Sequence, residues 1–171
     1  MPCVIIVDPT NLPDVKKYKF TGEINKDNLT SFVQSWLNGE LIPFLKSDEI
    51  PEENDSIVKE IVGKNYEKIV SDGEKDVIVY IYKKECDKCI EIEPVYAELA
   101  KSLSKNTNLL FTKLDGSNNQ IEVTYEIFPT FLFYPGNNKK DHIKFEGELN
   151  FRELNDFVLK NRYFQYYKND L

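Results

Sequence analysis

A short apolar run followed by a cysteine pair is the feature that most constrains how this chain can fold. Val77 to Tyr82 is an unbroken run of six residues rich in β-branched and aromatic side chains, which predicts a strand buried on both faces of a sheet. Cys86 and Cys89 come next, and the apolar residues that follow them recur at helical spacing. We therefore expect the C-x-x-C pair on the first turn of a helix that follows a buried strand.

This position predicts redox chemistry, because the thiolate is the species that attacks a disulfide. A helix N-terminus stabilises an anion through its unpaired N–H groups and its partial positive charge. Cys86, at the start of the helix, is therefore the expected nucleophile. Cys89 lies about one turn further on, should be the more buried of the two, and can resolve the mixed disulfide that Cys86 forms.

Charged residues of both signs flank the cysteines. Three lysines favour the thiolate and three carboxylates oppose it: Lys83, Lys84 and Lys88 against Glu85, Asp87 and Glu91. These opposing charges act on the same sulfur, so their effects on its acidity partly cancel. We therefore expect Cys86 to be activated only moderately.

Two other interpretations of the cysteine pair remain open. The pair could supply half of a zinc site, but the other cysteine, Cys3, and the single histidine, His142, are remote in sequence, so four ligands are hard to assemble. The pair could also form a purely structural disulfide, although so short a loop gains little stabilisation from its closure. We expect redox chemistry, with no bound metal and no cofactor.

The segment Asp76 to Cys89 resembles the active-site strand and helix of the thioredoxin superfamily, and residues 57–163 are similar throughout to the catalytic domains of protein disulfide isomerases. The resemblance implies an α/β, thioredoxin-like fold, in which a mixed central sheet carries helices on both faces. The further matches lie far apart in the sequence and are Pro94, the strand Phe111 to Asp115, the loop Phe128-Pro129-Thr130, and Phe145-Glu146-Gly147.

The resemblance also implies an activity and its partners. The activity is thiol-disulfide exchange, which forms, reduces or rearranges disulfides in folding secretory proteins. Its partners would be unfolded or misfolded secretory polypeptides, and glutathione or a disulfide-donating oxidoreductase. The alternative is a redox-weakened, chaperone-like module that binds unfolded polypeptide near Phe128. A cytosolic thioredoxin-type reductant is a third possibility, which the ending and the extra partial domain described below disfavour.

The loop Phe128-Pro129-Thr130 is the expected substrate-binding element. In the family this proline follows a cis peptide bond and faces the cysteine pair, and the residue before it exposes backbone groups to an extended substrate. Phe128 would then offer an apolar contact and a strand edge to unfolded polypeptide. An ordinary trans proline at the start of a strand is the alternative, since cis peptide bonds are uncommon.

Departures from the family pattern lie on both sides of Cys86. Asp87 and Lys88 stand where disulfide isomerases usually have glycine and histidine, and Glu85 stands where they have tryptophan. A carboxylate beside Cys86 disfavours the thiolate and changes the surface that a substrate meets. We therefore expect these three residues to modify the reactivity of Cys86.

The strand position beneath the second cysteine departs from the pattern as well. The family buries a glutamate there to move the proton of that cysteine, with a lysine nearby. Lys113 matches the lysine, but Tyr80 replaces the glutamate and does not ionise easily near neutral pH. The family's arginine before the proline loop is also absent, with about Glu126 in its place. These departures predict that Cys89 resolves mixed disulfides slowly, because its usual base is missing.

Composition and charge limit the partners. The chain of 171 residues carries a formal net charge of −7, which disfavours nucleic acid and anionic membranes as partners. No apolar run approaches the roughly 20 residues of a membrane span. The segment Met1 to Val7 lacks a basic start and is too short for a signal peptide, so we expect a fragment of a longer protein.

Residues 1–47 form the first predicted domain. Two strands are expected, a buried one at Val4 to Val7 and a second at Lys16 to Thr21, followed by a helix from Asn28 to Leu45 with a possible break at Gly39 or Pro43. This part resembles the last third of the noncatalytic thioredoxin-like domain that precedes the final catalytic domain. Its missing two thirds would leave an apolar face uncovered. We therefore expect residues 1–47 to lean on a neighbouring chain, to exchange elements with one, or to be poorly ordered.

A polar, acidic linker at 48–56 precedes the catalytic domain, 57–163, and a flexible tail, 164–171, follows it. The tail ends in Lys168-Asn169-Asp170-Leu171, which resembles an endoplasmic-reticulum retrieval signal, so the lumen of that compartment is the expected location. The expected strands of the catalytic domain are Ile57–Val62, Val77–Tyr82, Leu109–Leu114, Thr130–Tyr134 and His142–Glu146, and its helices are 63–71, 86–105, 118–125 and 150–161.

Overall fold

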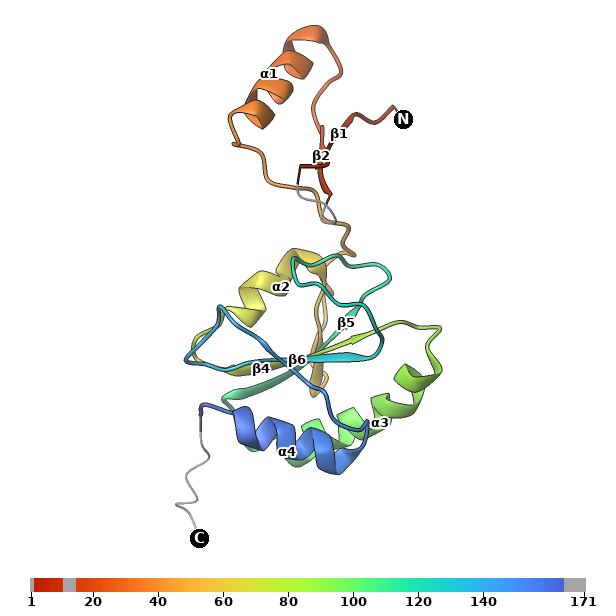
Figure 1. Cartoon of the computed structure of the whole chain (residues 1–171), viewed down its shortest axis with the longest axis vertical. Helices are drawn as coiled ribbons and strands as arrows, with labels where there is room; N and C mark the ends of the chain where they lie inside the picture. The colour runs from red at the N-terminus through yellow and green to blue at the C-terminus, as the bar shows by residue number, and fades with distance from the viewer. Residues whose placement is uncertain (1, 11–14, 165–171) are drawn as a thin grey trace. The chain divides into compact units, whose positions relative to one another are not determined.

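The computed structural model describes residues 2–10 and 15–164. The chain divides into two compact units, Met1–Leu45 and Lys46–Leu171 (Figure 1). Of the helices that the structure describes, none combines the length and the apolarity that a membrane crossing requires.

The first unit consists of a two-stranded sheet and one helix. Strands β1 (Ile5–Asp8) and β2 (Lys16–Lys19) form at the two predicted places and pair antiparallel with each other. Helix α1 (Lys26–Leu37) begins where the Asn25 side chain accepts the N–H of Asn28 at 2.9 Å. The helix ends before Gly39, whose φ of +72° is a left-handed conformation that favours glycine.

Apolar side chains of the first unit are largely exposed. No residue of α1 is buried, and the side chains of β1 alternate between exposed and half-buried. The prediction of a buried strand at Val4 to Val7 is therefore wrong, because two short strands and one helix cannot cover both faces of that strand. The exposed apolar residues of this unit include Ile5, Val7, Ile24, Val33, Leu37, Ile42, Phe44 and Leu45.

The second unit is built on a five-stranded mixed sheet in the order β3-β5-β4-β6-β7. Strands β3, β5 and β4 run parallel, whereas β6 is antiparallel to β4 and β7 is antiparallel to β6. The strands are β3 (Val58–Glu60), β4 (Asp76–Tyr82), β5 (Leu109–Asp115), β6 (Thr130–Tyr134) and β7 (Ile143–Lys144), and the helices are α2 (Gly63–Val70), α3 (Asp87–Ser102) and α4 (Phe151–Asn161).

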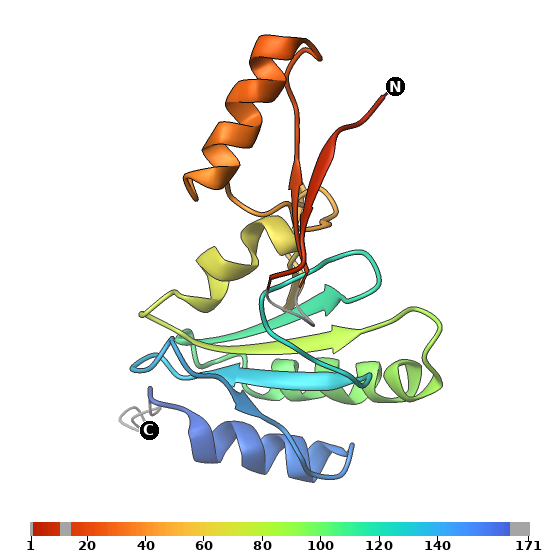
Figure 2. The same cartoon turned by 45° about the horizontal axis from the view of Figure 1, so that its top comes forward.

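Strand β4 lies in the middle of this sheet and has a separate core on each face. Ile78 and Tyr80 belong to the cluster that α3 and α4 cover, whereas Val77, Val79 and Ile81 belong to the cluster on the side of α2. Figure 2 shows α2 on one side of the sheet and α3 with α4 on the other. The predictions of a strand buried on both faces and of a mixed sheet with helices on both sides are confirmed.

The helix predicted at Asn118 to Tyr125 does not form. The Asn119 side chain is 2% exposed, and its Oδ1 accepts the backbone N–H groups of Asp48 and Gly63, each at 3.0 Å. Its Nδ2 donates to the Asp115 carbonyl oxygen at 3.1 Å. These tertiary hydrogen bonds hold the segment as a loop, because a side-chain amide competes with the helical bonds of the backbone.

Residues at the start of the second unit are hydrogen-bonded to this loop. The Lys46 N–H donates to Gln120 Oε1 at 3.0 Å, and the Gln120 N–H donates to the Lys46 carbonyl at 2.7 Å. Further along, Asn54 Nδ2 donates to the Glu60 carbonyl at 2.7 Å. The second unit therefore begins at Lys46, ahead of the polar segment 48–56.

A buried carboxylate holds three segments of the second unit together. Asp76, at the start of β4, is fully buried. Its Oδ1 accepts the Gly136 N–H at 2.8 Å, and its Oδ2 accepts the N–H groups of Tyr163 and Phe164, each at 3.0 Å. The carboxylate thereby links β4 to the turn after β6 and to the chain beyond α4.

We predict that Asp76→Ala lowers the free energy of unfolding of the second unit by about 2–4 kcal/mol, because three backbone donors lose a charged acceptor. Glu74→Ala removes an exposed carboxylate from the preceding turn and is the matched control. Urea denaturation followed by far-ultraviolet circular dichroism measures both variants. Equal midpoints for Asp76→Ala and Glu74→Ala would contradict this account.

Candidate active site

Cys86 is the N-cap residue of helix α3 and comes directly before its first residue, Asp87. Its backbone is extended, and its Sγ accepts the N–H of Cys89 at 3.2 Å. Its carbonyl oxygen accepts the first helical N–H, that of Ile90, at 3.0 Å. The cysteine pair therefore lies on the first turn of the helix after β4, where the partial positive charge of the helix favours an anion on Cys86 Sγ.

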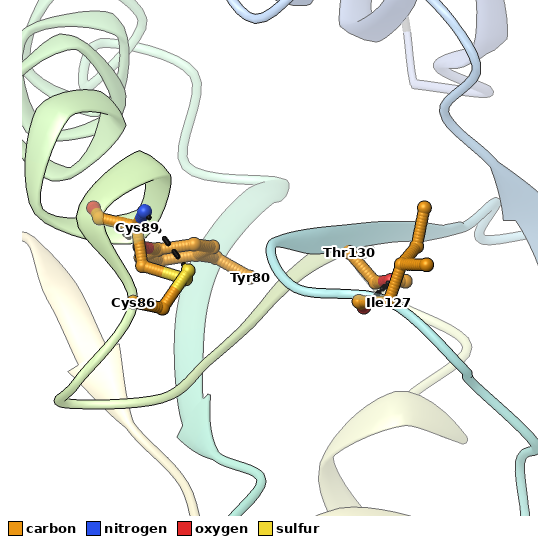
Figure 3. Close-up of a disulfide and its surroundings, with 5 residues drawn as sticks. All are labelled: Tyr80, Cys86, Cys89, Ile127 and Thr130. Carbon is orange, nitrogen blue, oxygen red and sulfur yellow. Dashed lines mark hydrogen bonds between the residues drawn. A yellow bond between two sulfur atoms is a disulfide. The ribbon is translucent and has the colours of Figure 1, made fainter.

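Cys86 and Cys89 are joined by a disulfide, with their Cα atoms 5.1 Å apart (Figure 3). Cys86 is half-buried, whereas Cys89 is only 2% exposed and belongs to the core cluster under α3. The expected difference in burial between the two cysteines is confirmed. Solvent reaches the first sulfur of the pair more easily than the second.

Tyr80 lies directly beneath the second cysteine, at the position that the sequence resemblance indicated. The residue is fully buried, and its hydroxyl donates to the Cys89 carbonyl oxygen at 2.8 Å (Figure 3). Its ring stacks on Phe131 at a centroid distance of 4.9 Å. Burial, and then repulsion by the Glu93 carboxylate, raises the pKa of the Tyr80 hydroxyl. Tyr80 is therefore a neutral hydrogen-bond donor at this site.

Lys113 pairs with a carboxylate that the sequence did not single out. It lies opposite Tyr80 in the parallel register of β4 and β5. Its Nζ is 2.9 Å from Glu93 Oε1 and lies 5.6 Å from the centroid of the Tyr82 ring. The signal that would have found Glu93 is its place four residues after Cys89, because residues at that spacing share one face of a helix.

The charged residues beside Cys86 are solvated, and two lysines contact other groups. Glu85, Asp87 and Lys88 are all exposed. Lys83 Nζ lies 4.3 Å from the centroid of the Phe128 ring, and Lys84 Nζ lies 3.9 Å from Asp115 Oδ2. Water screens the three exposed charges, so they affect the sulfur less than buried charges would.

The peptide bond between Phe128 and Pro129 is cis, as the sequence resemblance implied. The bond lies in the loop before β6, where Thr130 Oγ1 donates to the Ile127 carbonyl oxygen at 2.7 Å (Figure 3). A cavity of about 300 Å³ connects this loop to the start of α3, since Lys88 forms part of its wall together with Phe128 and Pro129. The loop and the first turn of α3 therefore border one space.

The Phe128 ring is half-buried. It packs edge-on against Tyr125 at a centroid distance of 5.5 Å, with Lys83 over it. It also passes so close to Gly116 that a Cβ there would lie 2.7 Å from a ring carbon. Ile127, which is 62% exposed, is the more accessible apolar side chain of this loop. No pattern in the sequence pointed to Ile127, because only the fold decides which of the two side chains turns inward.

No three histidine, cysteine, aspartate or glutamate side chains lie close enough to hold a metal ion among residues 2–10 and 15–164. Cys3 is a free, exposed cysteine. The ending Lys168 to Leu171 lies outside the described residues.

Comparison with known families decides the classification. Residues 57–160 match the family model named Thioredoxin. The chain belongs to the thioredoxin family. The matched range contains the cysteine pair, the strand beneath it and the cis-proline loop. The resemblance seen in the sequence is thereby confirmed.

Curated relatives are named as disulfide isomerases. Protein disulfide isomerase-like 1-4 of Arabidopsis thaliana is 44% identical over 135 residues, which cover 78% of this chain and 23% of that protein. Protein disulfide-isomerase of Saccharomyces cerevisiae is 38% identical over 138 residues, covering 80% of this chain and 26% of that protein. Protein disulfide-isomerase A3 of Gallus gallus is 37% identical over 146 residues, which cover 83% of this chain and 28% of that protein. The chain therefore spans about a quarter of the length of these relatives.

Solved structures agree on the fold. The first thioredoxin domain of mouse protein disulfide-isomerase A4 aligns with a TM-score of 0.55 and 17% identity, over 72% of this chain and 89% of that chain. The J-Trx1 fragment of ERdj5 aligns with a TM-score of 0.52 and 15% identity, over 62% of this chain and 52% of that chain. These values support the thioredoxin fold of the second unit.

We predict that Tyr80→Phe lowers the free energy of unfolding by about 1 kcal/mol, because the Cys89 carbonyl loses a buried hydrogen bond while the stacking on Phe131 remains. Tyr82→Phe is the control, since no hydrogen bond of the Tyr82 hydroxyl is found within the described part of the chain. Urea denaturation of the oxidised protein compares the two. A larger loss for Tyr82→Phe than for Tyr80→Phe would rule out this role of the hydroxyl.

We also predict that Cys86 of the reduced chain reacts with iodoacetamide at least about threefold faster than Cys3 near neutral pH, because the helix start lowers the pKa of a thiol. Cys3 is an exposed cysteine of the same chain and serves as an internal control. Mass spectrometry after timed alkylation across a pH series separates the two sites. Identical pH profiles at both sites would remove the basis for Cys86 as the nucleophile.

Proposed function

We propose that this chain is the catalytic thioredoxin domain of a thiol-disulfide oxidoreductase and isomerase. The observation that carries the proposal is the disulfide pair on the first turn of α3, with a half-buried Cys86 and a buried Cys89. Similarity to protein disulfide isomerases over the same residues supports it. The substrates would be disulfides and thiols of unfolded or misfolded secretory polypeptides.

The proposed exchange proceeds in two steps. The Cys86 thiolate attacks one sulfur of a substrate disulfide, so a Cys86–substrate bond forms and the other substrate sulfur leaves as a thiolate. Reshuffling ends when a substrate thiolate attacks the mixed disulfide and releases Cys86. Reduction of the substrate ends when the Cys89 thiolate attacks Cys86 Sγ, which forms the internal disulfide and releases the second substrate thiolate. Oxidation of a substrate is the reverse of these steps.

Substrate would bind across the cis-proline loop. The cavity of about 300 Å³ beside Lys88 offers room for one side chain of an extended polypeptide. Ile127 offers an exposed apolar contact, and Pro129 lies in the wall of the same cavity. Unfolded chains expose apolar side chains and backbone groups together, so this surface suits them better than it suits a folded protein.

Glutathione, or a disulfide-donating oxidoreductase, would return the cysteine pair to its starting redox state after each turnover. The lumen of the endoplasmic reticulum is the proposed compartment, since disulfides form and persist in oxidising compartments. Residues 1–47 would be the end of a noncatalytic thioredoxin-like domain, joined to the catalytic domain at 57–163 through the segment 48–56. The exposed apolar side chains of residues 1–47 support the need for a partner that covers them; Ile42, for example, is 89% exposed.

A second candidate function is a chaperone-like module that binds unfolded polypeptide without exchanging disulfides. Tyr80 supports this candidate, because a neutral hydroxyl replaces the carboxylate that the family places beneath the second cysteine. The two candidates share the binding surface beside Ile127 and differ in whether Cys86 reacts.

We predict that Cys86→Ser reduces the reactivation of a protein with scrambled disulfides to about the uncatalysed rate, because the attacking sulfur is lost. Cys89→Ser is the matched variant, which should retain part of the reshuffling activity and accumulate mixed disulfides with substrate. Recovery of substrate activity and non-reducing electrophoresis measure the two effects. Equal reactivation by the unmodified chain and by Cys86→Ser would favour the chaperone-like module.

A further inference from the structure

The second step of the exchange demands a proton acceptor near Cys89. Before its sulfur can attack Cys86, the Cys89 thiol must lose a proton. Cys89 is 2% exposed and lies among apolar side chains. Forming a thiolate in such surroundings costs free energy, because the charge is removed from water. A base that takes this proton would therefore speed the step.

Tyr80 cannot fill this role. Its hydroxyl already donates to the Cys89 carbonyl oxygen, and a neutral phenol has no tendency to take up a further proton near neutral pH. Burial also raises its pKa, so it does not become a phenolate base. The acceptor must come from another element around the same site.

A cavity of about 530 Å³ adjoins this site on the side of β5. Tyr80, whose hydroxyl donates to the Cys89 carbonyl oxygen, forms part of its wall, whereas Cys89 does not. Most of this wall is apolar, so water in the cavity binds beside its few polar groups, which include Glu93 and Lys113. The titratable and charged groups that line it are Tyr80 from β4, Glu93, Tyr96, Glu98 and Lys101 from α3, and Lys113 from β5.

Two carboxylates line the cavity, and helical geometry separates their roles. Glu93 follows Cys89 by four residues, so it lies on nearly the same face of α3 and about 6 Å further along the axis. Glu98 follows Cys89 by nine residues, which places it on the opposite face and roughly 13 Å along the axis. Glu93 is therefore the carboxylate closer to the sulfur.

Lys113 fixes the position of the Glu93 carboxylate. Its Nζ is 2.9 Å from Glu93 Oε1, and it reaches the cavity from the strand beside Tyr80. The Glu93 side chain is 48% exposed, so a proton taken up there passes readily to solvent. A carboxylate held in this way is both oriented and in contact with water.

We propose that Glu93, oriented by Lys113, accepts the proton of Cys89 through a bridging water and so takes the place of a base on β4. The proposal rests on the proposed function and names the group that serves its second step. The Cys89 S–H proton passes to the carboxylate. The Cys89 thiolate then forms the bond to Cys86 Sγ, the bond from Cys86 to substrate breaks, and the substrate sulfur leaves with the electron pair and takes up a proton from the carboxylic acid or from solvent. Glu93 on α3 would thereby compensate for the missing base on β4, whose absence predicts slow resolution by Cys89.

The test separates the two steps with oxidised glutathione as the substrate. The reduced full chain, carrying Cys3→Ser because Cys3 is an exposed free cysteine, is mixed with oxidised glutathione, quenched in acid and weighed by mass spectrometry. The Cys86–glutathione adduct reports the first step, and its conversion to the internal disulfide reports the second. We expect Glu93→Gln to slow the second step roughly tenfold or more near neutral pH and to change the first step less than about twofold.

Two matched variants make the result specific. Glu98→Gln removes a carboxylate from the same cavity, and we expect it to leave both steps unchanged. Lys113→Gln breaks the same ion pair but keeps the carboxylate, and we expect it to slow the second step less than about threefold. An equal loss in Glu98→Gln, or a loss in Lys113→Gln as large as that in Glu93→Gln, overturns the proposal.

The pH profile adds a readout that a structural role would not move. The deficit of Glu93→Gln should shrink as the pH rises above the ordinary thiol pKa of about 8.5, because a buried thiol such as Cys89 ionises without help only beyond that value. A deficit of constant size, or none at neutral pH, overturns the proposal while the proposed function stands. If the unmodified chain forms neither the adduct nor the internal disulfide, it is the proposed function that fails.

Discussion

Strand β4 is covered on both faces, and the position of the disulfide depends on this burial. Its side chains alternate between the core under α3 and α4 and the core on the side of α2, so a shift by one residue would reverse every one of them. This register places Tyr80 beneath the cysteine pair and brings the start of α3 to the end of β4. Asp76 secures the other end of the strand, through hydrogen bonds to the turn after β6 and to the chain beyond α4.

The surroundings of Cys89 combine a neutral donor on the strand with a charged pair at the edge of the same cavity. Tyr80 occupies the buried position, where an unpaired carboxylate would be costly to ionise. Glu93 and Lys113 lie where water reaches them, and each offsets the charge of the other. The carboxylate of this region therefore lies on the helix and not on the strand, and no charge of the described residues is buried beneath Cys89.

Wrong predictions share one physical cause, which is that contacts distant in sequence decided the outcome. The sequence predicts a short helix at 118–125, yet Asn119 bonds Asp48 and Gly63 and holds the segment as a loop. The strand β1 forms as predicted but is not buried, since the first unit has too few elements to cover it. The cis-proline loop shows the same effect of distant contacts without contradicting a prediction, since the half-buried ring of Phe128 packs against Tyr125 and Ile127 is left exposed.

Apart from the helix expected at 118–125, the sequence by itself determined the order of strands and helices, the cysteine pair at the start of α3 and the family, because apolar periodicity and local motifs depend on neighbours along the chain. It also determined that Tyr80 lies beneath Cys89, through a resemblance that extends over the whole strand. Only the tertiary structure decided that Glu93 meets Lys113 beside Tyr80, and that Lys83 lies over Phe128. The reason is that such pairs join side chains from different elements, and their distance is set by how the helices pack on the sheet.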